Sequence, residues 1–289
     1  WSTVDGLTFN EAGMLLLGGL YTGWMDLGVD PVIVGDGSYL LESTVNGAAT
    51  WNLGLDGFWL GDISVDGAGN IILSGTLNDT SELAGLQVGP TDGPYVLVAK
   101  LDPIGQALFA QSCFATIPQS TTCYSTVTPS GDILLAGQLT GMYNSEGGPW
   151  TDIPGEIIHL AALNPSGGMI WSRSLENGEP TFARGVAADS QGNAYFTGAF
   201  AGALDFGGGV LSSVSSTTDM FVAVYDPAGG PLWTQAYGSD GDLRGMRIAV
   251  DPGGAVVVAG EATGAVDFGD GELEPIGDQD VFVTRLLPP

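Results

Sequence analysis

One pattern recurs five times along the chain, with a period of about sixty residues. In each repeat a glycine ends a short apolar run, and these glycines are Gly19, Gly75, Gly137, Gly198 and Gly260. Successive glycines are therefore separated by 56 to 62 residues. A period in this range is typical of proteins that stack copies of one small structural unit, because a single unit cannot cover its own apolar faces. We therefore expect five similar units.

Each repeat predicts four short strands. A turn lies nine residues before each glycine, and it opens with Asn10, Asp66, Thr128, Asp189 or Asp251. Asp, Asn and Gly at such positions are common in hairpins. A third apolar run follows about twenty residues after the glycine, and a fourth run carries an aromatic residue in four repeats, at Trp51, Phe109, Trp171 and Trp233. Short apolar runs between turn signals, without helical periodicity, predict antiparallel β-strands.

These features predict an all-β fold, a five-bladed β-propeller made of four-stranded antiparallel blades. We expect one domain over residues 1–289, with repeats at about 4–51, 61–109, 123–171, 182–233 and 243–289. The last repeat lacks its aromatic fourth strand, whereas the chain opens with Trp1. The sequence therefore predicts that residues 1–3 complete the last blade, so that the N-terminal strand closes the ring.

Several segments resemble a known repeat family. They are residues 248–251 (IAVD), 189–193 (DSQGN), 205–209 (DFGGG), 219–227 (DMFVAVYDP) and 232–238 (LWTQAYG). In these segments the chain resembles the SBBP-type β-propeller repeats of bacterial secreted and surface proteins. Repeats four and five match closely, and repeat one lacks the Asp-Pro turn. The resemblance implies a propeller that is secreted or displayed on the cell surface, and it carries no common catalytic motif.

The charge balance excludes some partners. The chain has 33 acidic and 6 basic side chains, which gives a formal net charge of −27, and 44% of its residues are apolar. So many apolar residues can build a core, which a disordered acidic tail cannot do. Six scattered basic residues cannot form a phosphate-binding patch, so nucleic acid is not an expected partner. No apolar stretch reaches the roughly 18 residues that a membrane-spanning helix needs.

Two cysteines, Cys113 and Cys123, lie ten residues apart in a connection between repeats. We expect them to form a disulfide that stabilises the fold by about 2–3 kcal/mol in an oxidising compartment. The alternative is a pair of buried thiols.

The sequence favours a protein without enzymatic activity and without a required cofactor. A glycosidase needs two facing carboxylates, but the first strand of each repeat has no interior acid. His159 is the single histidine, and it occupies the position that holds Leu97 and Phe221 in other repeats. We therefore expect a buried, hydrogen-bonded histidine.

Acidic residues recur after the second strand of several repeats. Asp26, Asp205 and Asp267 each open an Asp-apolar-Gly triplet. One interpretation is a ring of carboxylates that binds Ca²⁺ weakly. The favoured interpretation is that each aspartate caps a tight turn. Lys100 and Arg285 occupy equivalent strand ends, where we expect solvated charges.

Four aromatic residues in the loops after the second strand are candidate ligand contacts: Tyr21, Trp24, Tyr143 and Trp150. Flat rings beside Gly, Asp and Asn are common in sugar- and peptide-binding loops. The alternative is that these rings fold back over the blades. Trp24 and Trp150 are the best candidates.

The leading function is a binding or scaffold module for a protein partner or for self-assembly. A lectin that uses these aromatics, with or without Ca²⁺, is the alternative, and a glycosidase comes third.

Overall fold

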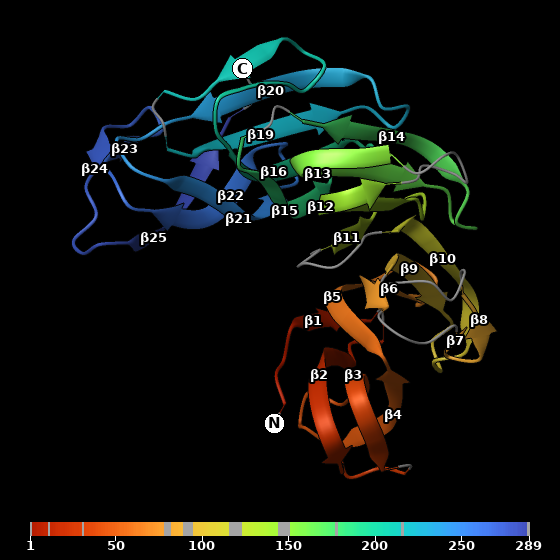
Figure 1. The fold of residues 1–289 in the computed structure, drawn as a ribbon. Helices are drawn as coiled ribbons and strands as arrows, with labels where there is room; N and C mark the ends of the chain where they lie inside the picture. The colour runs from red at the N-terminus through yellow and green to blue at the C-terminus, as the bar shows by residue number, and fades with distance from the viewer. Residues whose placement is uncertain are drawn as a thin grey trace. The chain divides into compact units, whose positions relative to one another are not determined.

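The computed structural model describes the chain except residues 1, 11, 31, 78–81, 89–94, 116–122, 144–150, 177–178, 215–216 and 288–289. For residues 82, 87, 95, 112–115, 139–143 and 151–156 it describes the backbone alone. The described residues form strands, turns and loops (Figure 1), and no helix among them is suited to cross a membrane. The chain divides into two compact units. Unit 1 is Trp1–Val127 with Gly141–Asp152, and unit 2 is Thr128–Thr140 with Ile153–Pro289.

Four-stranded antiparallel sheets follow one another along the chain, as the repeats predict. The first contains β1 (Gly6–Phe9), β2 (Leu15–Met25), β3 (Ile33–Ser43) and β4 (Ala49–Asp56). The second contains β5 (Phe58–Val65), β6 (Ile71–Leu77), β9 (Tyr95–Leu101) and β10 (Ala107–Ala115). The third contains β11 (Cys123–Val127), β12 (Ile133–Tyr143), β13 (Thr151–Leu163) and β14 (Met169–Leu175). The fourth contains β15 (Thr181–Ala188), β16 (Ala194–Phe200), β19 (Asp219–Tyr225) and β20 (Pro231–Tyr237).

The fifth sheet has three strands in the described part of the chain: β21 (Leu243–Val250), β22 (Val256–Ala262) and β25 (Asp280–Leu286). Three small hairpins lie between the second and third strands of their repeats, and the sequence patterns missed them because each strand has only two or three residues. They are β7 (Glu82–Leu83) with β8 (Leu86–Gln87), β17 (Ala203–Asp205) with β18 (Val210–Ser212), and β23 (Val266–Asp267) with β24 (Glu272–Leu273).

The predicted turns are confirmed. In the turn of the second sheet, the amide of Gly69 donates to the carbonyl of Asp66, and the carboxylate of Asp66 accepts from the amides of Ala68 and Asn70. Gly69 has a φ of 82°, which is strained for residues with a Cβ. The same pattern recurs at Asp189 and Asp251. Local chemistry therefore sets the hairpins of each repeat.

In unit 1, the first and second sheets pack face to face. Leu16, Leu40 and Leu55 of the first sheet share a buried cluster with Leu60 and Leu73 of the second. Burial of such side chains contributes about 1.5–3 kcal/mol each. The face of the second sheet that meets the first is therefore core rather than surface.

In unit 2, the fourth sheet is covered on both faces. Phe196 and Phe221 pack with Leu160 of β13 on one face. On the other face, Met220 and Val222 belong to a cluster with residues of the fifth sheet, among them Val256, Val258 and Leu286. All seven residues of β19 are buried as a result.

The N-terminal segment does not join the fifth sheet, and this corrects the sequence-based prediction. Ser2 forms a bridge with Tyr21, and the amides of Thr3 and Asp5 donate to carbonyls of β2 at 3.0 and 2.9 Å. The segment thus continues β1 along β2, where Gly19 has no Cβ to block the carbonyl of Thr3. Trp1 lies outside the described residues. Among those residues, β25 has β22 as its single neighbouring strand.

Candidate binding site

The hairpin of β2 and β3 extends beyond its flanking strands. β4 pairs with β3 only as far as Gly37, and the N-terminal segment reaches β2 only as far as Tyr21. The register of β2 and β3 continues to Met25 and Ile33. Residues 22–25 and 33–36 therefore form a two-stranded arm, which Figure 1 shows at the ends of β2 and β3.

One face of the arm exposes two large apolar side chains. Trp24 is 74% exposed and Val34 is 72% exposed. They are direct cross-strand partners, so both side chains lie on the same face of the hairpin. An exposed indole beside an aliphatic side chain is suited to contact an apolar surface on a partner. The predicted ligand residue Trp24 is therefore accessible, although it lies on a strand rather than in a loop.

The other face of the arm is held by a small core. Ile33 and Tyr21 are buried with Tyr39, and Met25 and Leu27 pack against them. Tyr21 is 2% exposed, and its burial, with Asp56 and Asp36 nearby, raises its pKa. The expectation that Tyr21 contacts a ligand is corrected here, because strand alternation points Tyr21 into the core.

Hydrogen bonds fix the shape of the arm. The carboxylate of Asp36 accepts from the amide of Gly23 at 3.1 Å, and that of Asp56 accepts from the amide of Asp36 at 3.0 Å. Gly35 has a φ of 134°, and a Cβ there would lie 2.5 Å from Oδ1 of Asp56. Asn52 donates to the carbonyl of Val29 at 2.7 Å, which fastens the loop of the arm to β4. Such preorganisation lowers the entropic cost of binding.

The other two predicted aromatics cannot be placed in this site. Tyr143 is the last residue of β12, and its side chain lies outside the described residues. Trp150 lies wholly outside them. Both remain predictions.

The three predicted cation ligands cap turns. Oδ1 of Asp205 accepts from the amides of Gly207 and Gly209, and Oδ1 of Asp267 accepts from those of Gly269 and Gly271, at 2.7 to 3.3 Å. Asp26 accepts from the amide of Gly28 at 2.9 Å. Within the described ranges, no group of three or more His, Cys, Asp or Glu residues is arranged to hold a metal ion. The turn-capping interpretation accounts for all three aspartates.

The predicted disulfide stays a prediction. Cys123 begins β11 and is buried, and its carbonyl accepts from the hydroxyl of Ser74 at 3.1 Å. The side chain of Cys113 lies outside the described residues.

His159 is a buried packing residue, as its place in the repeat predicts. Its Nδ1 lies 2.9 Å from Oγ of Ser174, and burial lowers its pKa to about 3. A neutral imidazole in the core cannot contact a solvent-borne substrate.

The charges at the predicted exposed strand ends are paired with turn residues. Nζ of Lys100 lies 2.8 Å from Oδ2 of Asp66, and Lys100 is only 6% exposed. Arg285 and Asp251 form the equivalent pair in the fifth sheet at 2.9 Å, with Arg285 well exposed. The expectation of a solvated Lys100 was wrong, because its ammonium group is buried in an ion pair with Asp66.

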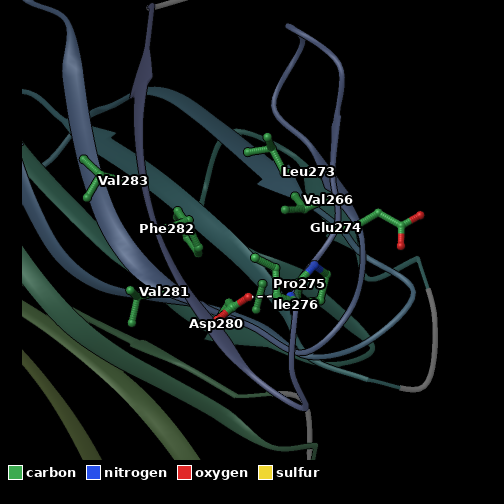
Figure 2. Close-up of a pocket in the computed structure, with 10 residues that line it drawn as sticks. Val266, Leu273, Glu274, Pro275, Ile276, Asp280, Val281, Phe282 and Val283 are labelled. Atoms are coloured by element: carbon green, nitrogen blue, oxygen red, sulfur yellow. Dashed lines mark hydrogen bonds between the residues drawn. The ribbon is translucent and has the colours of Figure 1, made fainter.

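A groove of about 390 Å³ lies in unit 2 beside β25 (Figure 2). Its apolar wall includes Val266, Leu273, Ile276 and Phe282. Oδ2 of Asp280 accepts from the amide of Ile276 at 2.6 Å and holds one rim of the groove. Val281 and Val283, which also line the groove, are 83% and 75% exposed.

Comparisons with known proteins give distant likenesses. No protein-family model matches the chain. A curated relative, an uncharacterized WD repeat-containing protein of Acanthamoeba polyphaga mimivirus, is 23% identical over 202 residues, or 58% of this chain. The matched region spans only 14% of that protein.

Solved structures of similar fold include propeller domains. The chain resembles the Dos1 propeller with a TM-score of 0.47 and 9% identity, over 91% of this chain and 54% of the other. It resembles the WD40 domain of Neurospora crassa Pan2 with a TM-score of 0.46 and 11% identity, over 91% and 76%. A Xanthomonas campestris gluconolactonase matches with a TM-score of 0.46 and 15% identity, over 95% and 76%.

Proposed function

We propose that this chain is a non-catalytic binding module, secreted or displayed on the cell surface, and that the arm of β2 and β3 contacts a protein partner. The observation that carries the proposal is the exposed pair Trp24 and Val34 on a hydrogen-bonded hairpin. Tryptophan is enriched among residues that dominate protein interfaces, and a preformed hairpin can present it without a folding cost.

The charge around the arm defines the partner further. Asp26, Asp30 and Asp36 are exposed around Trp24, and the whole chain has a formal net charge of −27. A partner with an apolar pocket and a basic rim would complement this surface. Binding should weaken as ionic strength rises, because rim charges are screened. A second copy of this acidic chain is a less suitable partner for the arm.

We propose further that the five sheets are the blades of one closed propeller. In unit 2, the fifth sheet is covered on one face only, and Val281 and Val283 are exposed on the other. In unit 1, β1 of the first sheet exposes Leu7 and Phe9 on the face opposite Leu16. Closure of a ring would cover both faces and would make the groove beside β25 part of the blade packing.

The test compares two exposed tryptophans. The immobilised protein is incubated with an extract of cell-surface proteins, and a retained protein is then purified and its Kd measured. Trp24→Ala should weaken binding at least tenfold, whereas Trp59→Ala on β5, a half-exposed control, should leave it unchanged. Equal binding by wild type and Trp24→Ala would contradict the role of the arm.

The alternative function, a lectin, is favoured by the exposed indole of Trp24 with the carboxylate of Asp36 nearby on the arm. A glycan array of the purified chain, with Ca²⁺ and again with a chelator, tests it. Saccharide binding that Trp24→Ala abolishes would move the lectin to first place. Dependence on Ca²⁺ would give Asp26, Asp205 and Asp267 a role besides turn capping.

A further inference from the structure

Half of the basic side chains of this acidic protein gather in one place in unit 2. The chain has six Lys and Arg residues against 33 acidic residues. Arg184 lies on β15, and Arg244 and Arg247 lie on β21. These strands lie side by side (Figure 1): a Cβ at Gly185 would be 3.0 Å from the amide nitrogen of Ile248. We call Arg184, Arg244 and Arg247 the arginine patch.

One aromatic ring orients two of the guanidinium groups. The guanidinium carbon of Arg184 lies 5.0 Å from the centre of the Phe182 ring, and that of Arg244 lies 5.8 Å from it. Arg184 is the extra residue of a β-bulge between Ala183 and Gly185, and bulges often redirect a side chain. A guanidinium held over a ring keeps its N–H edge available for a ligand.

The third arginine ties the two strands together. Nη1 of Arg247 donates to the carbonyl of Arg184 at 3.3 Å and to that of Met246 at 2.9 Å. This exposed side chain therefore brings a third positive charge to the bulge. Like charges this close repel one another, and an anion bound beside them lowers that repulsion.

The ion pairs of the described residues reach one arginine of the patch and leave out Arg184. Arg244 pairs with Asp242 at 2.8 Å, and its Nε is a buried donor without an acceptor among the described residues. Among the described residues, Arg184 takes part in no ion pair. Glu261 is the cross-strand partner of Arg244 on β22. Arg184 thus keeps a positive charge that none of these ion pairs balances, in a chain with a formal net charge of −27.

We propose that the arginine patch binds a small ligand through a single carboxylate. The fork of a guanidinium matches the two oxygens of a carboxylate. Phosphate oxygens fit the same fork, so inorganic phosphate is the competing ligand in the test below. The site lies in unit 2, away from the arm in the sequence, and does not depend on the function proposed for the arm.

The Nε–Hε signals of the five arginines in ¹⁵N-labelled protein report binding directly. The probes are D-glucuronate and N-acetylalanine, with D-glucose and N-acetylalaninamide as neutral controls, at an ionic strength matched with NaCl. We expect saturable shifts at Arg184 and Arg244 with both carboxylates, and none at Arg173 or Arg285. The tighter probe indicates whether the natural carboxylate belongs to an acidic sugar or to a peptide C-terminus.

Variants distinguish a specific carboxylate site from general electrostatic attraction of anions to arginine. Arg184→Gln should raise the Kd at least tenfold, and Arg184→Lys, which keeps the charge but loses the fork, should raise it less. The matched control Arg285→Gln removes one charge from the same unit outside the patch and should leave the Kd unchanged. Shifts that do not saturate, equal losses in both glutamine variants, or tighter binding of inorganic phosphate than of glucuronate would each overturn the proposal.

Discussion

The fourth and fifth sheets of unit 2 share one strand pattern but differ in what covers them. Phe221 of β19 and Phe282 of β25 both pair with a repeat glycine, Gly198 and Gly260, and both are buried. On the opposite face, Met220 and Val222 are 0% exposed, whereas the equivalent Val281 and Val283 are 83% and 75% exposed. The fifth sheet lies on that face of β19, whereas within the described residues of unit 2 no sheet lies on that face of β25. Whether the face of a strand is buried therefore depends on whether another sheet packs against it.

The largest expected effect concerns the covered face of the fourth sheet. Val222→Asp should destabilise the protein by about 3–5 kcal/mol, because it places an unpaired charge in a core. Urea denaturation measures this loss. The matched control, Val34→Asp on the exposed face of the arm, should change the free energy of unfolding by less than about 0.5 kcal/mol. Similar losses in the two variants would break the distinction between covered and open faces.

The second prediction compares the paired charges of the second and fifth sheets. Lys100→Met should cost about 3 kcal/mol, since it leaves Asp66 buried without its partner. Arg285→Met should cost much less, because Arg285 and Asp251 are partly solvated.

The pH dependence of the Lys100 variant is a further check. Burial acts to raise the pKa of Asp66, but hydrogen bonds from Lys100 and Asn70 leave it below 3.8. The contribution of this carboxylate is therefore present above pH 3.8 and is lost as the pH falls through its lowered pKa. The stability difference between wild type and Lys100→Met should narrow in acid. A difference that stays constant down to pH 2 would contradict the role of the pair.

The third prediction compares His159 with Phe221, which occupy equivalent positions in the third and fourth sheets. The folded state keeps His159 neutral, with a pKa of about 3 against 6.5 for the free side chain. Stability should therefore fall by about 1.4 kcal/mol per pH unit as the pH drops below 6.5. His159→Phe should remove this slope between pH 6.5 and 4 in urea titrations. An unchanged slope would show that His159 titrates normally in the folded protein.

The smallest effect concerns two aspartates that begin the third strands of the fourth and fifth sheets. Asp219 is fully buried, and Oδ1 accepts no hydrogen bond within the described part of the chain. Burial raises its pKa, although the amide of Val214 donates to Oδ2. A raised folded-state pKa stabilises the protein at low pH, and this contribution is lost as the pH rises through that pKa.

Asp219→Asn should therefore stabilise the protein by about 1 kcal/mol at pH 7 and by almost nothing at pH 3. The exposed equivalent, Asp280→Asn, should have little effect at either pH. Thermal unfolding at the two pH values measures both variants. A loss of stability in Asp219→Asn at pH 7 would mean that the carboxylate is needed in its charged form.

Local signals were enough to predict the strands and turns of the sheets, because Asp66 and Gly69 determine their hairpin by short-range hydrogen bonds. The burial of Lys100 was not predictable, since it depends on contacts with residues far away in the sequence. The sequence analysis placed Tyr21 and Trp24 in one loop, because Gly23 and the neighbouring glycines argued against a long strand. Once β2 extends to Met25, the two-residue alternation of a strand separates the buried ring from the exposed one.

The arginine patch also depends on contacts between residues that lie far apart in the sequence. Arg184 and Arg247 are 63 residues apart, about one repeat period, and the six basic residues seemed scattered. Alignment of the repeats places Arg184 and Met246 at the same bulge, which brings Arg244 and Arg247 next to it. Basic residues close to the same bulge in consecutive repeats, Arg184 in one and Arg244 and Arg247 in the next, were the signal that would have found the patch.

The most direct test of the closed-propeller account is the unfolding free energy of Val283→Asp, measured beside Val222→Asp. If ring closure covers this face of the fifth sheet, Val283→Asp should lose about 2–3 kcal/mol, approaching the loss at Val222. A change within about 0.5 kcal/mol would contradict closure, because it would mean that the face of β25 stays open in solution.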